Sequence, residues 1–146
     1  MNVYAGSDHA GFALKQRLVE EARKLGHEVT DLGPEAADRV DYPDFGAKVG
    51  RAVAGDPGSL GILCCGSGIG IGIAANKVAG VRAATVWDES SARLCRLHND
   101  ANVISIGERL VAEARAVEML KTFLSTEFEG GRHQGRVDKI DALHTA

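Results

Sequence analysis

The sequence predicts an α/β fold, a three-layer α/β/α Rossmann-like sandwich around a five-stranded parallel sheet. Apolar strand segments alternate with helical segments along the chain, and the connections between them are short. One strand–helix junction also carries four glycines in alternate positions. With 146 residues, 45% of them hydrophobic and 25% charged, the chain suits one soluble domain spanning residues 1–146.

The predicted elements follow in order. Strands are expected where short apolar runs occur, at residues 2–5, 28–32, 62–65, 81–86 and 103–106. Helices are expected where apolar side chains recur at helical spacing, at residues 12–25, 45–54, 89–98 and 110–124, and a further helix follows the glycines. Residues 33–43 read as a polar loop. The tail, from about residue 125 to 146, follows the last core helix and is free to contact a partner subunit.

The charge and cysteine content exclude several classes of protein. The net charge of −3 gives no overall field toward nucleic acid or membranes, and no apolar run approaches the ~18 residues of a membrane span. Nothing at the start of the sequence resembles a signal peptide. Three cysteines without CxxC spacing resemble reduced thiols, which predicts a cytoplasmic protein. The histidines show neither HxxxH nor HxH spacing, so we expect no metal and no cofactor.

The glycine-rich stretch, residues 60–77, organises the predicted site. A tight loop there turns backbone N–H groups and the positive end of a helix toward one point, which suits a phosphate or an oxyanion. Cys65 stands directly before the loop, where a helix N-terminus stabilises a thiolate. Strand alternation sends Cys64 and Cys65 to opposite faces, so at least one of them packs in the core. Cys64 and Cys95 are interpreted as packing residues.

A nucleotide-binding module is an alternative interpretation of the same stretch. The run from Gly70 to Ala75 matches the letters of a dinucleotide fingerprint, and Asp88 follows at a tolerable distance. That match begins several residues after the strand should end, and the turn itself, Gly66 to Gly70, does not fit it. No GK[ST] follows, which excludes a P-loop.

Other chemistry-bearing residues stand at strand ends and in the tail. In a parallel sheet ligands bind outside the carboxyl ends of the strands, where we expect Asp8, His9 and Arg109 beside Cys65. His98 stands at the end of a helix, where only a bend or a long helix top could bring it to those residues. In the tail Arg132, His133 and Arg136 form either a phosphate-binding cluster or a solvated basic turn.

Six motifs in this order resemble ribose-5-phosphate isomerase type B, a family that includes galactose-6-phosphate isomerase subunits and allose-6-phosphate isomerases. The motifs are Gly6-Ser-Asp-His-Ala-Gly11, Asp41-Tyr-Pro43, Cys65-Gly-Ser-Gly-Ile-Gly70, Ala74-Ala-Asn-Lys77, His98-Asn-Asp-Ala-Asn-Val103 and Gly130-Gly-Arg-His133. The resemblance covers about residues 1 to 143. It implies the strand order 2-1-3-5-4 and a metal-independent homodimer, sometimes paired into tetramers, with active sites between subunits.

The resemblance also implies roles. Cys65 is the base that moves a proton between C1 and C2, and Ser67 is the hydroxyl beside it, where many members have threonine. His98 and Asp8 assist ring opening, and Tyr42 lines the sugar. The cis-enediolate is held by the side chain of Asn99 and the backbone N–H groups of Gly66, Ser67, Gly68, Ile69 and Gly70. The phosphate is held by His9, Arg109, Arg132, His133 and Arg136, with the tail residues supplied by the partner chain.

The expected activity is therefore the interconversion of ribose 5-phosphate and ribulose 5-phosphate. One branch of the family places a glutamate base where this chain has Ile71, which favours the cysteine branch. A general base supplies typically ~10²–10⁴-fold, and each donor at a developing oxyanion can add ~10²–10³-fold, so base and loop are needed together. A six-carbon sugar phosphate, or the role of an idle subunit in a two-chain isomerase, stays open.

Overall fold

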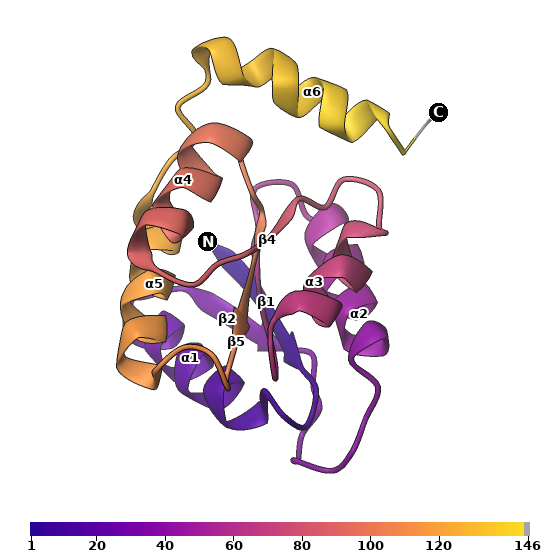
Figure 1. Ribbon diagram of the computed structural model, residues 1–146, viewed down its shortest axis with the longest axis vertical. Coiled ribbons are helices and arrows are strands. Elements are labelled where there is room, and N and C mark those ends of the chain that lie inside the picture. The colour runs from indigo at the N-terminus through magenta and orange to yellow at the C-terminus, as the bar shows by residue number, and fades with distance from the viewer. Residues whose placement is uncertain (145–146) are drawn as a thin grey trace.

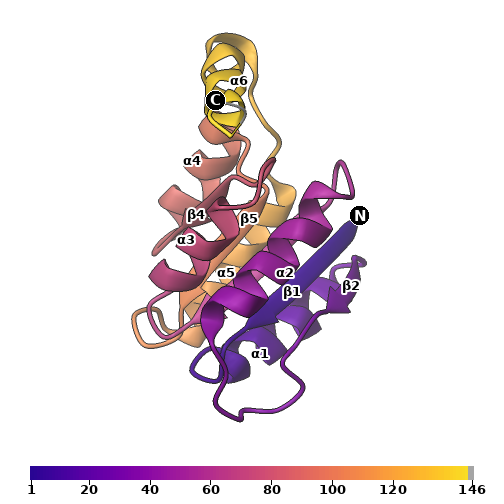
Figure 2. The same ribbon diagram turned by 90° about the vertical axis from the view of Figure 1, so that its right-hand side faces the viewer.

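The computed structural model describes residues 1–144 and shows one parallel five-stranded sheet between two layers of helices (Figures 1 and 2). The strand order is β2-β1-β3-β5-β4, which confirms the predicted fold class and order. The strands are β1 (Asn2–Ser7), β2 (Glu28–Asp31), β3 (Leu60–Cys65), β4 (Ala83–Thr85) and β5 (Val103–Gly107). The helices are α1 (Phe12–Lys24), α2 (Tyr42–Ala54), α3 (Ile69–Asn76), α4 (Glu89–Asn99), α5 (Glu113–Ser125), the 3₁₀ turn η1 (Gly131–His133) and α6 (Gln134–Ala142).

Two hydrophobic cores lie on the two faces of the sheet. Helices α1, α4 and α5 cover one face, and α2 and α3 cover the other (Figure 1). The central strand β3 is buried along its whole length, as expected for a strand covered on both sides. Cys64 packs in the first core and Cys65 in the second, which confirms that the two thiols face opposite sides.

Element boundaries differ from the sequence prediction in several places. Helix α2 begins at Tyr42 rather than Phe45, because Pro43 in the first turn needs no backbone donor and is pre-set for a helix start. Helix α5 begins at Glu113 rather than Leu110, because residues 107–111 form a turn in which Leu110 and Val111 both donate to the Gly107 carbonyl. Strand β4 keeps only three residues at the sheet edge.

The tail folds into η1 and α6 across the end of the sheet where the strands begin (Figure 1). Gly130 and Gly131 turn the chain there with φ values of +70° and +56°, a left-handed conformation that glycine adopts readily. Residues 145–146, the last two of the predicted tail, lie outside the described residues. In the part of the chain from residue 1 to 144, no helix has the length and apolar character needed to cross a membrane.

Candidate active site

The loop after β3 depends on glycine at residue 68. Gly68 has φ +76°, and a Cβ there would lie 2.8 Å from the backbone of Ile106 and Gly107. The Gly68 carbonyl accepts hydrogen bonds from Ser105 Oγ (2.6 Å) and Thr85 Oγ1 (3.1 Å). Hydroxyls on β4 and β5 therefore fix the loop against the sheet.

Cys65 meets this loop at its sulfur. The backbone N–H of Gly68 donates to Cys65 Sγ at 3.1 Å, from the residue that caps the start of α3. An amide donor and the positive end of a helix both stabilise a thiolate, which is the nucleophilic and basic form of cysteine. Only 4% of Cys65 is exposed, and that part opens on a cavity of about 590 Å³.

The other two cysteines have surroundings that oppose ionisation. Complete burial raises the pKa of the Cys64 thiol, and the nearby carboxylate of Glu108 raises it further. Burial also raises the pKa of Cys95, to about 11. Both interpretations of these residues as packing side chains agree with their burial in the core.

The cavity lies outside the carboxyl ends of the strands, at the position expected for a ligand site in a parallel sheet. It is closed by the end of β1, the loop after β3, the start of α2 and the end of β5. Its lining includes Asp8, His9, Ala10, Tyr42, Cys65, Gly66, Ser67, Ile69, Gly70, Ile73, Arg109 and Leu110. The cavity thus brings together the predicted site residues from the strand ends, those from the loop, and Tyr42. Gly68 is the one predicted loop residue that does not line the cavity, and it contacts the site through its hydrogen bond to the Cys65 sulfur.

Two glycines let larger side chains lie against the loop. A Cβ on Gly66 would lie 3.0 Å from Nη1 of Arg109, whose backbone N–H also donates to the Gly66 carbonyl at 3.0 Å. A Cβ on Gly70 would lie 2.6 Å from the ring of Tyr42. The guanidinium and the phenol therefore both line the cavity close to the backbone of the loop.

Asp8, His9 and Ser67 are held by backbone donors. The carboxylate of Asp8, 7% exposed, accepts from the N–H of Gly11 at 2.9 Å. His9 Nδ1 accepts from the N–H of Val40 at 3.3 Å, so a neutral His9 carries its proton on Nε2. Ser67 Oγ accepts from the N–H of Ile69 at 3.2 Å, which leaves the hydroxyl hydrogen available to another acceptor.

A second group of predicted site residues lies at the opposite end of the sheet, near the tail (Figure 1). The rings of His98 and His133 stack with centroids 4.3 Å apart and planes 18° apart. Burial lowers the pKa of His133, and the nearby His98 and Arg132 lower it further, against a raising effect of Glu129. His133 is 5% exposed and its Nε2 has no hydrogen-bond partner. The positive charge of Arg136 also lowers the pKa of His133.

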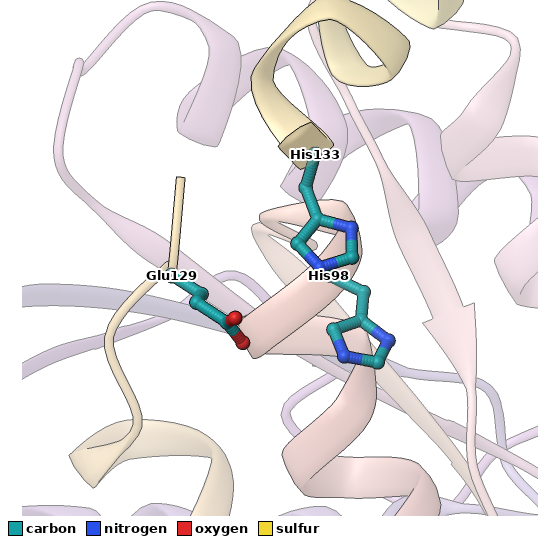
Figure 3. Close-up of side chains that lie close together, drawn as sticks. All are labelled: His98, Glu129 and His133. Carbon is teal, nitrogen blue, oxygen red and sulfur yellow. The ribbon is translucent and has the colours of Figure 1, made fainter. Parts of the chain in front are cut away.

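Glu129 joins the two histidines in a cluster that residue spacing did not reveal (Figure 3). One nitrogen or oxygen of each of His98, Glu129 and His133 lies within 4.8 Å of the others, close enough to suggest a cation site. However, imidazole lone pairs lie in the ring plane, so two stacked rings direct them along separate lines. The geometry describes a stacked pair better than a shared metal ligand set.

Within one protomer the two groups do not meet. Asn99 lines a different cavity, of about 440 Å³, between the body of the protein and Ile140 of α6. His98 stacks on the tail and does not line the cavity of Cys65, so the helix end does not bend toward the strand ends. Of the predicted phosphate ligands, His9 and Arg109 lie in the cavity, whereas Arg132, His133 and Arg136 belong to the tail.

The dinucleotide fingerprint loses its structural context. Gly70 and Gly72 lie inside α3 rather than at the turn between strand and helix. A Cβ on Gly72 would lie 2.9 Å from Thr85 Oγ1, so this glycine serves the packing of α3 on the sheet. At the turn between strand and helix, where a pyrophosphate would need free backbone N–H groups, the N–H of Gly68 already donates to Cys65 Sγ.

Comparison with known protein families matches residues 3–140 to the family described as Ribose/Galactose Isomerase. The chain belongs to this family. Ribose-5-phosphate isomerase B of Escherichia coli strain K12 is 46% identical over 138 residues, which cover 94% of this chain and 93% of that protein. Ribose-5-phosphate isomerase B of Mycobacterium tuberculosis strain H37Rv is 45% identical over 140 residues, covering 94% and 86%.

Solved structures of family members share the fold. The structure of Clostridium thermocellum ribose-5-phosphate isomerase B superposes with a TM-score of 0.97 at 46% identity and covers 99% of this chain and 98% of that one. Ribose-5-phosphate isomerase B from Mycoplasma genitalium, solved with bound ribulose-5-phosphate, superposes with a TM-score of 0.95 at 42% identity and covers 99% and 96%.

Proposed function

We propose that this chain is a ribose-5-phosphate isomerase that interconverts ribose 5-phosphate and ribulose 5-phosphate. The observation that carries the proposal is the shared cavity of a cysteine sulfur and a loop of backbone amides, with the N–H of Gly68 on Cys65 Sγ at 3.1 Å. Base and oxyanion donors stand side by side, as an aldose–ketose isomerisation requires. The names of the family relatives, at 45–46% identity over almost the whole chain, agree with this substrate.

Cys65 is the base in this proposal. Its thiolate takes the proton from C2 of the open-chain aldose, the C–H electrons form the C1–C2 double bond, and the carbonyl oxygen on C1 becomes the negative oxygen of a cis-enediolate. A proton moves from the oxygen on C2 to the oxygen on C1, for which the free hydroxyl hydrogen of Ser67 is placed beside the loop. The thiol then returns its proton to C1, which completes the ketose and restores the thiolate.

The loop amides stabilise the enediolate while Arg109 and His9 hold the phosphate. The N–H groups around Gly66 to Gly70 precede a helix whose positive end faces the same cavity. A guanidinium fork donates paired hydrogen bonds to phosphate oxygens, and Arg109 lies directly against Gly66. The phosphate is remote from the reacting carbons, so its binding orients the sugar on Cys65. Tyr42 closes the side of the sugar.

The remaining site residues come from a second copy of the chain. The C-terminal end of α4, which carries His98 for ring opening with Asp8 and Asn99 for the enediolate, lies near α6 (Figure 1), whereas Cys65 ends β3 and lines the other cavity. Arg132, His133 and Arg136 accompany them on the tail and would complete the phosphate site. In a two-fold dimer the tail end of each copy faces the cavity of the other, and both sites are completed at once.

The experiment is turnover of the purified chain on a panel of aldose phosphates, with ketose formation as the readout. We expect the highest kcat/KM with ribose 5-phosphate, and lower values with allose 6-phosphate and galactose 6-phosphate. A preference for a six-carbon sugar would move the substrate but keep the reaction. Absence of turnover on every sugar, with a melting shift on adding NAD, would overturn the proposal in favour of a nucleotide-binding module.

The three free cysteines suit a reducing compartment, and we place the enzyme in the cytoplasm.

A further inference from the structure

Helix α4 ends in a backbone conformation that its sequence does not favour. Asp100, the C-cap of α4, has φ 46° and ψ 43°, and it is the one non-glycine residue with positive φ among residues 1–144. Helix ends of this kind are usually occupied by glycine or asparagine. Such a strained residue persists only when its surroundings over-determine it, and strained residues cluster at functional sites.

Two arginines hold Asp100 in this conformation. Nη1 of Arg96 donates to Asp100 Oδ1 at 2.7 Å and also to the carbonyl of Ala101 at 2.7 Å. Nη2 of Arg82 lies 3.5 Å from Asp100 Oδ2, and its Nε donates to the Asp100 carbonyl at 2.9 Å. The backbone N–H of Asp100 donates to the Arg96 carbonyl at 3.2 Å. The carboxylate, the carbonyl and the N–H of Asp100 are therefore all held by hydrogen bonds. We call Arg82, Arg96 and Asp100 together the Asp100 clamp.

The two arginines of the clamp are largely buried, whereas its carboxylate is partly open to water. The side chains of Arg82 and Arg96 are 15% and 12% exposed and that of Asp100 is 34% exposed, so solvent screens the charges of the arginines less than those of a surface pair. Other charged groups face the same place, since Arg82 Nη1 also binds both carboxylate oxygens of Asp141 at 2.9 and 3.1 Å.

The same arginines hold the tail. Arg96 Nε donates to the carbonyl of Thr126 at 3.1 Å, at the point where the chain leaves α5. The pair between Arg82 and Asp141 fixes α6. The clamp thus connects three separate segments: the end of α4, the chain after α5, and α6. The end of α4 carries His98 and Asn99, and the tail carries Arg132 and Arg136.

We propose that Asp100 is a positioning residue, which through Arg82 and Arg96 fixes the end of α4 so that His98 and Asn99 meet the substrate in a partner copy. The inference rests on the proposed function, because it assigns these two residues to the reaction. His98 and Asn99 directly precede Asp100, so the direction of their backbone follows from the cap. A displacement of about 1 Å at such a group can lower turnover by about 10²-fold.

Three substitutions separate the clamp from the backbone strain. Asp100→Ala removes the carboxylate and keeps a Cβ in the strained left-handed conformation; Asp100→Gly removes both the carboxylate and the strain; Asp100→Asn keeps the conformation and one acceptor. We expect kcat on ribose 5-phosphate to fall about 10- to 100-fold in the Ala and Gly variants and less in the Asn variant. Wild-type kcat in the folded Gly variant would overturn the proposal. Glu20→Ala, which breaks the exposed pair with Lys24, is the matched control and should leave kcat unchanged.

A double-mutant cycle shows whether Asp100 acts through His98. In a His98→Asn background, Asp100→Gly should lower kcat/KM by at most about 3-fold, because the group that it positions is already gone. Fully additive losses would mean a separate structural role and would overturn the proposal.

An NMR measurement decides the same point without turnover. Stacking on His133 should shift the His98 ring proton signals of the wild-type chain upfield, and Asp100→Gly should reduce that shift. An unchanged His98 signal in the folded variant would overturn the proposal. If the wild-type chain turned over no sugar phosphate, the proposed function would fail, while this signal would still show whether the clamp orients His98.

Discussion

The backbone N–H of Gly68 donates to Cys65 Sγ across 3.1 Å, so one amide of the glycine loop is already aimed at the sulfur before any ligand arrives. This preorganisation needs no rearrangement at the moment of reaction, which is the condition under which fixed donors are most effective.

Cys65→Ala should abolish isomerisation while keeping the fold. The thiolate is the proposed base, and removal of a general base lowers kcat by about 10²–10⁴-fold. Ketose formation from ribose 5-phosphate measures the effect, and circular dichroism checks the fold. Cys95→Ala, which removes a thiol buried on the other face of the sheet, is the control and should retain wild-type kcat. Wild-type turnover by Cys65→Ala would remove this residue from the mechanism.

Gly68→Ala should destabilise the protein more than Gly58→Ala. Both glycines have left-handed backbone, with φ +76° and +89°, so alanine at either residue carries a conformational penalty of about 1–2 kcal/mol. Only at residue 68 does the new Cβ meet backbone atoms, at 2.8 Å, whereas Gly58 has nothing within 4 Å. We expect a further loss of about 1–3 kcal/mol, measured by urea unfolding. Equal losses would mean that the contact with Ile106 and Gly107 relaxes freely.

Arg109→Ala should raise KM for ribose 5-phosphate about 10- to 100-fold, since hydrogen bonds to a charged group contribute about 1.5–3 kcal/mol. Arg109→Lys should recover only part of the loss, because an ammonium cannot donate as a planar fork. Steady-state kinetics measure both variants, with the exposed Arg51→Ala as control. An unchanged KM in Arg109→Ala would place the phosphate elsewhere.

Two impaired variants, each lacking one site residue, should restore activity when they are co-expressed. Cys65→Ala retains His98, and His98→Asn retains Cys65, so a mixed dimer holds one intact site if each site takes residues from both copies. Random pairing then gives about a quarter of wild-type activity. Recovery below 1% of wild type would show that each chain carries its own complete site.

Stability should fall as the pH drops from neutrality through the ordinary titration range of histidine. Burial lowers the folded-state pKa of His133 and of His27, so between the folded and unfolded pKa values the unfolded chain binds more protons. The stabilising effect is present above the unfolded pKa, near 6.5, and is lost toward the lower folded value. Melting temperatures between pH 8 and 5.5 measure it, and His27→Gln combined with His133→Gln should flatten the slope. An unchanged slope would contradict the assignment.

The sheet could be predicted because its signals are local. The buried run before Cys65 and the helical spacing in residues 12–25 each require only neighbouring residues, and parallel strands with short crossovers leave few topologies. The observed element boundaries differ from the predicted ones where a turn replaces the first residues of a predicted helix, as at residues 107–111 before α5. Helix α6 lacked an apolar stripe to identify it: Val137 is its one buried residue, and its start is set by two left-handed glycines.

The candidate site was predicted in two unequal parts. Asp8, Cys65 and Arg109 end neighbouring strands, so parallel geometry alone brings them together. His98 ends a helix at the opposite end of the sheet, and no signal in a single sequence shows whether a second copy brings it to Cys65. The Asp100 clamp was only partly readable, since Arg96 and Asp100 are four residues apart at the end of α4, whereas Arg82 precedes β4 and meets them only in the folded chain.

The adjacent thiols Cys64 and Cys65 point to opposite layers, and only the second opens on a cavity. An alkylating reagent is therefore expected to react at Cys65, because Cys64 has no exposed surface and burial raises the pKa of Cys95, which is 7% exposed, to about 11. The rate of modification of that sulfur becomes a direct gauge of occupancy: a sugar phosphate in the cavity slows labelling, and the concentration that halves the rate gives its dissociation constant, even for compounds that are never converted.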